Sequence, residues 1–520
     1  MLIRLLNTPG WHDLLECHRE EDPAGFVLRF AGKKGWPVRE IAEQLHCYPR
    51  AETKLGPLHR PGMIYLREAL EQASGYAAAT WRAEIVMGKT GGHAETDGEA
   101  DANANDDANA NDDANANANA NDDANANANA NANDDANANA NANANDDAGI
   151  PGGTDVSGSE SPGHEEPLIA DLTGGLGIDT TAFALAGAKV HYCERNETLA
   201  GIARHNIKLL DISERVDWHV GDGLEWLRSW NSQGGRKFDL VYVDPSRRRS
   251  ADRVITISQS EPNITGHLDL LRNAANRWFI KLSPMMDPVQ IMRSLPDCTS
   301  ITAVSVSGEM KELLADCTPE QQNQQEVTRS MAGEAHIRAV VLNRAGDELY
   351  DSGMVQHRPE NDAEGVPAVP AGSLLFEPDP SILKMKLIDQ TARRYGLSRI
   401  HPDIGYLTNG EQQSEPERMP ATVFPGKIYR IHRILPYKPR KLKRWLSDNG
   451  LTKVHLHQRG FPLTVEQLYS KLGCIMGDQA HLFATPTHDG QYVIIIAEKL
   501  HPDFMYSPEY PIMSENPSSL

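Results

Sequence analysis

The stretch that decides the fold runs from Asp171 to Asn196 and reads "DLTGGLGIDTTAFALAGAKVHYCERN". An apolar run that ends in Asp171 is followed by a Thr-Gly-Gly turn, a segment with helical character, and a second apolar run that ends in Glu194. Glycine lets the backbone turn tightly and approach a ligand, and the N-terminus of the next helix presents free N–H groups. The pattern predicts a strand, a turn, a helix and a second strand that together bind a nucleotide-like ligand.

Five apolar runs between residues 167 and 284 have the length and composition of buried strands. They cover 168–175, 189–195, 216–222, 238–245 and 277–284, and each is followed by a segment suited to a helix. This alternation predicts a parallel sheet with crossover helices, a Rossmann-like α/β fold. Two further runs, 299–310 and 334–343, leave little room for a helix after the first. We therefore expect an antiparallel pair at the sheet edge and seven strands in all.

Four acidic residues come at the ends of four successive predicted strands: Asp171, Glu194, Asp222 and Asp244. The carboxyl ends of parallel strands form the crevice where open α/β sheets bind ligands. There, Glu194 can accept hydrogen bonds from both hydroxyls of a ribose, and Asp222 can accept a hydrogen bond from the amino group of an adenine. Asp244 can lie beside the group that the ligand transfers. Asp222 has an equally good explanation as the cap of the following helix.

The glycine spacing favours one nucleotide-like ligand over another. A dinucleotide site of the GxGxxG type holds a pyrophosphate at the turn, but here the spacing is GGxG and a carboxylate stands beside it. That carboxylate repels a phosphate and suits a ligand with an ammonium and a sulfonium, as in S-adenosylmethionine. We predict that this cofactor is bound by Asp171, Thr173, Gly174, Gly175, Gly177, Asp179, Glu194 and Asp222.

Residues 167 to about 345 resemble the class I S-adenosylmethionine-dependent methyltransferases, with "DLTGGLGID" similar to their first motif. Flanking segments are similar to a bacterial methyltransferase family with a C-terminal THUMP-like domain: "LEQASGYAAATWRAEI", "DPSRR", "KLSPMMD", "GEMKELL", "FEPDPSILK" and "GKIYRIHRILPY". The resemblance implies a seven-stranded methyltransferase sheet. Because THUMP domains belong to RNA-modifying enzymes, it also implies RNA as the substrate.

The segment "DPSRRR" at 244–249 is predicted to carry the catalytic positions, Asp244 and Pro245. In amino-directed nucleic-acid methyltransferases the similar motif is Asp or Asn, two prolines and an aromatic residue, whereas Ser246 and Arg247 stand here. The aromatic residue that would stack on the target base is missing. Methyltransferases that attack uracil C5 need a cysteine nucleophile, and Ser283 lies where it is expected. The methylated atom therefore stays open.

Cations near this motif have two interpretations. Arg247 and Arg248 are predicted to contact substrate phosphate, and the alternative is a solvated loop. Lys281 is unusual inside a strand that should be buried, so we expect it to pair with Asp244 or to lie at the mouth of the cavity.

Composition divides the chain of 520 residues into six segments. Residues 1–88 have the three- and four-residue apolar periodicity of a helical domain. Residues 89–166 are predicted to form a disordered acidic linker, because residues 101–147 within them alternate Ala and Asn with inserted Asp pairs; an acidic competitor of nucleic acid is the alternative. The methyltransferase segment, 167–345, is followed by a predicted linker at 346–372, a basic α/β THUMP-like domain at 373–500 and a C-terminal tail at 501–520.

Charge is distributed unevenly. The chain contains 51 basic and 72 acidic residues, of which 18 acidic and no basic residues lie in 90–166. Residues 427–459 instead hold 10 Lys and Arg against Asp448 alone. The positive charge of this segment is larger than solubility requires, so we predict that Lys438, Arg440 and Lys441 contact an RNA backbone. His455 and His457 share one face of a strand but lack further ligands, so no metal is predicted.

The remaining features concern location and rival functions. Six cysteines are scattered without a CxxC pair, and no apolar stretch approaches the roughly 20 residues of a membrane span. We expect a cytoplasmic protein that does not bind membranes. Two other functions remain open: a non-catalytic RNA-binding protein that retains the methyltransferase scaffold, and a methyltransferase that acts on proteins or small molecules.

Overall fold

The computed structural model describes residues 2–88, 166–247, 256–319, 335–356, 373–410 and 424–500. Arg248, nearly all of the predicted acidic linker and the predicted tail at 501–520 lie outside these ranges, as does most of the predicted linker at 346–372. Within the ranges, no helix combines the length and the apolar character needed to span a bilayer.

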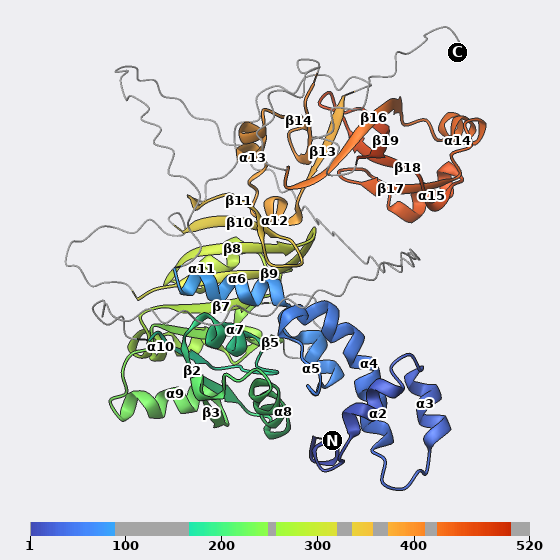
Figure 1. Cartoon of the computed structure of the whole chain (residues 1–520). Helices are drawn as coiled ribbons and strands as arrows, with labels where there is room; N and C mark the ends of the chain where they lie inside the picture. Colours follow the sequence, from blue (N-terminus) through green and yellow to red (C-terminus); the bar gives the residue numbers. More distant parts are fainter. Residues whose placement is uncertain are drawn as a thin grey trace, which may run out of the picture. The chain divides into compact units, whose positions relative to one another are not determined.

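The N-terminal part is helical (Figure 1). In the described residues up to 88, six α-helices occur: α1 (Leu2–Leu6), α2 (Trp11–Cys17), α3 (Pro23–Phe30), α4 (Val38–Leu55), α5 (Arg67–Gln72) and α6 (Tyr76–Val86). Trp11, Phe26, Tyr48 and Tyr65 are buried between them. The periodic segment that ends at Val86 was predicted to be helical throughout. It is instead divided between α5 and α6, because the backbone at Ala73 and Gly75 is extended.

A large sheet follows, and its strand order explains where a ligand can bind. Five of its strands are parallel: β1 (Leu168–Asp171), β2 (Lys189–Glu194), β3 (Val216–Val220), β4 (Leu240–Val243) and β7 (Trp278–Leu282). They lie in the order β7-β4-β1-β2-β3. The chain builds outward from β1 to β3 and then returns to the other side of β1, so the carboxyl ends of β1, β2 and β4 surround a topological switch point.

The far side of this sheet differs from the prediction. Strand β8 (Cys298–Val306) and β9 (Glu309–Cys317) form an antiparallel hairpin, and β9 inserts between β7 and β8. Residues 334–343 contain β10 (His336–Leu342), which pairs with β8 in parallel, so the predicted antiparallel pairing of these two runs is wrong. In sheet order, the seven strands β3, β2, β1, β4, β7, β9 and β8 form the methyltransferase sheet, and β9 is the strand that runs antiparallel to its neighbours. β9 was not predicted as a strand of its own, because its first residues, "EMKE", are mostly polar.

The predicted linker at 346–372 is also partly wrong. Its first residues form β11 (Glu348–Asp351) and β12 (Val355–Gln356), which both pair with β10 and extend the sheet to ten strands within the described residues.

Helices cover both faces of this sheet, and alternate residues of each strand divide between two cores. Ile169, Tyr192 and Tyr242 pack with α7 (Ile178–Ala186), α8 (Glu197–Lys208) and the N-terminal helices. Ala170 and Val243, on the opposite face, pack with α9 (Gly223–Ser232), α10 (Leu268–Ala274) and α11 (Pro288–Ser294). The result is a three-layer α/β/α arrangement, and α6 packs against α7 in one of the two helical layers.

A second sheet occupies the C-terminal part, with the strand order β14-β15-β13-β16-β19-β18-β17. Its strands are β13 (Leu374–Pro378), β14 (Ser398–His401), β15 (Ile404–Thr408), β16 (Gly426–Pro436), β17 (Lys453–Gln458), β18 (Ile475–Pro486) and β19 (Tyr492–Lys499). Helices α12 (Pro380–Lys384), α13 (Ile388–Tyr395), α14 (Pro439–Asp448) and α15 (Val465–Leu472) accompany them. The region begins with β13 and two short helices, α12 and α13, and Asp379 caps the first of these helices.

Candidate active site

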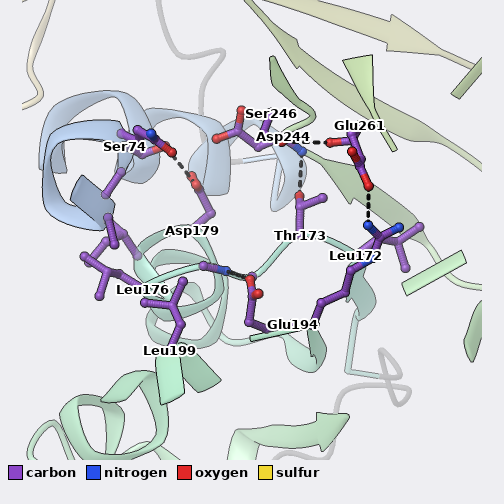
Figure 2. Close-up of a pocket in the computed structure, with 17 residues that line it drawn as sticks. Ser74, Leu172, Thr173, Leu176, Asp179, Glu194, Leu199, Asp244, Ser246 and Glu261 are labelled. Carbon is purple, nitrogen blue, oxygen red and sulfur yellow. Dashed lines mark hydrogen bonds and ion pairs between the residues drawn. The ribbon is translucent and has the colours of Figure 1, made fainter. Parts of the chain in front are cut away.

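A pocket of about 310 Å³ lies at the switch point of the large sheet (Figure 2). Its volume is at the lower end of the range for small-molecule sites, enough for one ligand. Its walls come from the turn after β1, the ends of β2 and β4, the first turn of α8, the short strand β6 (Ser260–Glu261), and α5 with the residues after it. Among the predicted site residues, the pocket is lined by Thr173, Gly174, Gly175, Asp179, Glu194 and Asp244.

The glycine turn after β1 requires two of its glycines for different reasons. At Gly174 a Cβ atom would lie 2.1 Å from Cε2 of Tyr192, so no larger residue fits. Gly177 has φ of +77° at the N-cap of α7, a left-handed conformation that favours glycine. The Tyr192 hydroxyl donates to the Gly175 carbonyl at 2.6 Å. The turn is thus pressed against β2, and its backbone forms the floor of the pocket.

Glu194 is held in a fixed orientation at the end of β2. Its Oε2 accepts from the Gly175 amide at 3.0 Å, and its Oε1 accepts from the Asn196 amide at 2.7 Å. A carboxylate oxygen has more than one acceptor site, so each oxygen can still accept a hydrogen bond from a ligand hydroxyl. The geometry therefore suits the ribose role predicted for Glu194.

Asp171 lies behind the turn rather than in the pocket wall. Its carboxylate is 1% exposed and accepts from the Thr173 amide at 3.1 Å and from the Thr180 hydroxyl at 2.7 Å. Burial raises the pKa of Asp171 to about 7. Both oxygens hold the glycine turn to α7, so the geometry does not support the predicted contact of Asp171 with the amino end of the cofactor.

Asp222 is a helix cap. Its Oδ1 accepts from the Glu225 amide at 2.9 Å at the start of α9, and its Oδ2 accepts from Nε of Arg195, also at 2.9 Å. Arg195 also pairs with Glu261 and lines the pocket, whereas Asp222 does not belong to the described wall. Asp222 thus reaches the site through Arg195, which the sequence analysis did not consider.

Asp244 forms an ion pair at the substrate side of the pocket. Its Oδ2 lies 2.6 Å from Nζ of Lys281, a contact that confirms the predicted pairing. Its backbone amide donates to the Thr173 hydroxyl at 2.7 Å, which joins the end of β4 to the turn after β1 (Figure 2). Burial raises the pKa of Asp244, and the Lys281 ammonium opposes that rise. The carboxylate is therefore positioned by two contacts and aimed at the pocket.

This ion pair continues into a buried network that includes the N-terminal helices. Lys281 Nζ donates to the Ser74 hydroxyl at 3.1 Å, and Ser74 donates to Asp179 Oδ2 at 2.8 Å. Arg82 of α6 is fully buried and pairs with both Asp179 and Glu312. Burial acts against the charge on Asp179, but the cations of Arg82 and Lys281 keep its pKa below the ordinary value. Ser74 and Arg82 lie in the segment "LEQASGYAAATWRAEI" that carries part of the family resemblance, but no role in a site was predicted for either residue.

The other predicted site residues lie away from the pocket wall. Gly177 and Pro245 flank residues that line it, and Arg247 lies in β5 (Ser246–Arg247), which pairs with β6. Lys438, Arg440 and Lys441 are exposed at α14 in the second sheet region.

Comparison with known proteins matches two parts of the chain to families. Residues 166–247 match the family model described as RNA cap guanine-N2 methyltransferase, and residues 426–499 match the model described as THUMP domain-like. The first match spans the strands from β1 to β5, and the second spans β16 to β19.

Individual relatives agree with these matches. An uncharacterized S-adenosylmethionine-dependent methyltransferase of Mycobacterium tuberculosis is 21% identical over 305 residues, 59% of this chain and 73% of that protein. Ribosomal RNA small subunit methyltransferase J of Coxiella burnetii is 34% identical over 95 residues, 17% of this chain and 36% of that protein. A crystal structure from Porphyromonas gingivalis W83, named as a methyltransferase, has the same fold, with a TM-score of 0.61, 21% identity and coverage of 95% of this chain and 98% of that one.

The fold, the pocket and these matches define an S-adenosylmethionine-dependent methyltransferase. It carries a THUMP-like domain at its C-terminal side, and both features confirm the resemblance found in the sequence. The residues present also fit the cofactor. Gly174 and Gly175 of the turn line the pocket, and the fixed Glu194 carboxylate supplies acceptors for a ribose.

Proposed function

We propose that this methyltransferase acts on RNA, with Asp244 at the site of transfer. The observation that carries the proposal is the single pocket volume that combines the glycine turn, the fixed carboxylate of Glu194 and the Asp244–Lys281 ion pair. S-adenosylmethionine supplies an electrophilic methyl group on a sulfonium. The protein has to align a nucleophile with that methyl group and exclude water, because alignment contributes most to such a displacement.

We propose an exocyclic amino group of a base as the acceptor. The family model that matches residues 166–247, up to the end of "DPSR", is described as RNA cap guanine-N2 methyltransferase. The amine of a base also needs hydrogen-bond acceptors at the transfer site. The Asp244 carboxylate, fixed by Lys281, provides one acceptor for such an N–H group. The absence of the Pro-aromatic pair at Ser246 and Arg247 means that a base-stacking residue has to come from elsewhere in the protein or from the RNA itself.

The surface at α14 supports RNA as the substrate. Leu442 and Leu446 are buried against the second sheet, while the basic residues of this helix point outward. The exposed cations on and beside α14 are Arg433, Lys438, Arg440, Lys441, Lys443 and Arg444. Among the described contacts, Asp448 is an acidic partner of one of them, Arg444, at 3.7 Å. A helix that presents this many cations suits a phosphate backbone. All six cysteines are free, which supports a reducing compartment such as the cytoplasm.

Calorimetry tests the cofactor assignment. We expect Glu194→Ala to weaken S-adenosylmethionine binding at least about tenfold, since a hydrogen bond to a charged group contributes about 1.5–3 kcal/mol. Glu197→Ala, an exposed residue in the first turn of α8, is the matched control and should bind like the wild type. Equal affinities of all three proteins would contradict the role of Glu194.

Transfer of a tritiated methyl group tests the substrate. The wild-type protein should label RNA from a strain that lacks its gene, and an excess of RNA already modified in the parent strain should accept little. Label in protein or in small molecules but not in RNA would refute the RNA assignment. RNA binding without any label would favour a non-catalytic protein.

A further inference from the structure

One wall of the cofactor pocket comes from the N-terminal helices, which neither the family matches nor the sequence analysis assigns to a site. Ala69 and Gln72 of α5, followed by Ala73 and Ser74, line the same cavity as Gly175 and Glu194. The family model for the methyltransferase begins only at residue 166. The wall is therefore separated from the glycine turn by about one hundred residues of sequence, yet it borders the same space.

The wall is fixed to the methyltransferase sheet by buried contacts. The Ser74 hydroxyl donates to Asp179 in the first turn of α7, and Arg82 of the next helix pairs with Asp179 and with Glu312 of β9. Farther out, the Asn206 side chain of α8 donates to the Ile64 carbonyl and accepts from the Ile64 amide, both at 2.9 Å. Such a doubly bonded and buried connection holds the helices in place. These buried contacts fix the wall in its position beside the glycine turn.

The position of the wall decides which ligand it meets. Ser74 bonds to Asp179, two residues after the last glycine of the turn, and Figure 2 shows both residues beside that turn. The strand pair β5–β6 borders the same cavity through Ser246 and Glu261. Because the cavity has room for about one ligand, a molecule seated on the glycine turn and Glu194 also reaches the helical wall.

We propose that α5 and the segment that joins it to α6 form part of the S-adenosylmethionine site and contact the bound cofactor directly. The N-terminal helices are then a functional component of the enzyme. This inference rests on the proposed use of the pocket for the cofactor. It adds the α5 wall to the residues that border the bound ligand.

A bulky residue in the wall provides the test. Ala69→Phe places a ring where α5 faces the pocket, and Glu68→Phe places the same ring on an exposed position of the same helix. Calorimetry with S-adenosylhomocysteine as the probe should show at least about tenfold weaker binding for Ala69→Phe, while Glu68→Phe should stay within about twofold of the wild type. Thermal unfolding of both variants verifies that they fold.

A second substitution protects the test against a variant that fails to fold. Gln72 is exposed and also lines the pocket, so Gln72→Trp can block the cavity without a change in the core. Weaker probe binding by folded Ala69→Phe or Gln72→Trp supports the inference. Wild-type affinity in the folded variants overturns it, including the case in which they bind the probe normally and fail only in RNA methylation, because the wall would then belong to the substrate. A wild-type protein that binds no probe would instead overturn the cofactor assignment itself.

Discussion

Cations occupy two contrasting environments in this protein. In the methyltransferase region, Arg82 is fully buried and Lys281 nearly so, and each has carboxylate partners at ion-pair distance. At α14 the cations are exposed and outnumber their acidic neighbours. A buried charge that loses its partner is costly, whereas an exposed charge costs little to remove but adds to a long-range field. The first group therefore serves structure and site geometry, and the second is available for a ligand.

The largest expected effect is on stability and comes from the buried group. Arg82→Met leaves the carboxylates of Asp179 and Glu312 buried without their cation, which should lower the free energy of unfolding by about 3–5 kcal/mol. Lys441→Met, at an exposed position of α14, should change it by less than about 0.5 kcal/mol. Urea denaturation measures both. Similar losses in the two variants would remove the contrast between the two environments.

A second effect concerns the pH dependence of methyl transfer. Burial raises the pKa of Asp244 and the Lys281 ammonium opposes it, so Lys281→Met should raise that pKa further. The carboxylate is then protonated over a wider range, and the acidic limb of the rate profile should move to higher pH. Lys281→Arg keeps the charge and should shift the limb less.

Rates of tritiated methyl transfer into RNA, measured from acidic to neutral pH, give the two profiles. A lower rate in Lys281→Met with an unchanged acidic limb would contradict the prediction. It would mean that Lys281 stabilises the structure around Asp244 without affecting the pKa of Asp244.

The exposed group should show its effect in RNA binding and not in stability. Replacement of Lys438, Arg440 and Lys441 by Gln removes three exposed cations at α14. Each phosphate contact to a single strand contributes about 0.7 to the slope of log affinity against log salt, so the slope should fall by about 2. Filter binding of RNA across a salt series measures it. S-adenosylmethionine affinity should not change.

A charge-matched control separates a local surface from net charge. Lys34, Lys208 and Arg228 are exposed on the N-terminal and methyltransferase parts, and their replacement by Gln removes the same charge. An equal loss of salt dependence in this control would assign RNA binding to the net charge of the protein.

The sequence predicted the parts of the fold that depend on local pattern. The turn at Gly174 and the strands on either side of it follow from residues close in sequence. Lys281 was noticed because a cation in an apolar strand needs a partner. By contrast, the place of β9 depends on pairing between β7 and β8, and its first residues are too polar to mark a strand.

The parts of the site that were missed depend on tertiary contacts. Ser74 reaches Asp179 across 105 positions of sequence, and Arg82 reaches Glu312 across 230. Both residues lie in the segment "LEQASGYAAATWRAEI", which resembles the family, but the segment does not indicate which distant residues Ser74 and Arg82 contact. Asp171 illustrates the opposite case. Its position beside the turn predicts a ligand contact, whereas in the structure its carboxylate accepts from the Thr173 amide at 3.1 Å and from the Thr180 hydroxyl at 2.7 Å.

The smallest effect decides between the two interpretations of Asp222 and extends the contrast to a half-exposed charge. As a cap, Asp222 should contribute about 1 kcal/mol to the stability of α9, so Asp222→Ala should destabilise the protein by that amount. Asp287 caps α11 in the same way, by accepting from the Val289 and Gln290 amides, and lies outside the pocket wall. Asp287→Ala should therefore cause a similar loss and leave cofactor affinity unchanged. If Asp222 acts only as a cap, the two variants should also bind S-adenosylmethionine equally. Weaker binding by Asp222→Ala alone would show that Asp222 has a role in cofactor binding besides the cap, either at the adenine or through Arg195, which lines the pocket and bonds to Asp222.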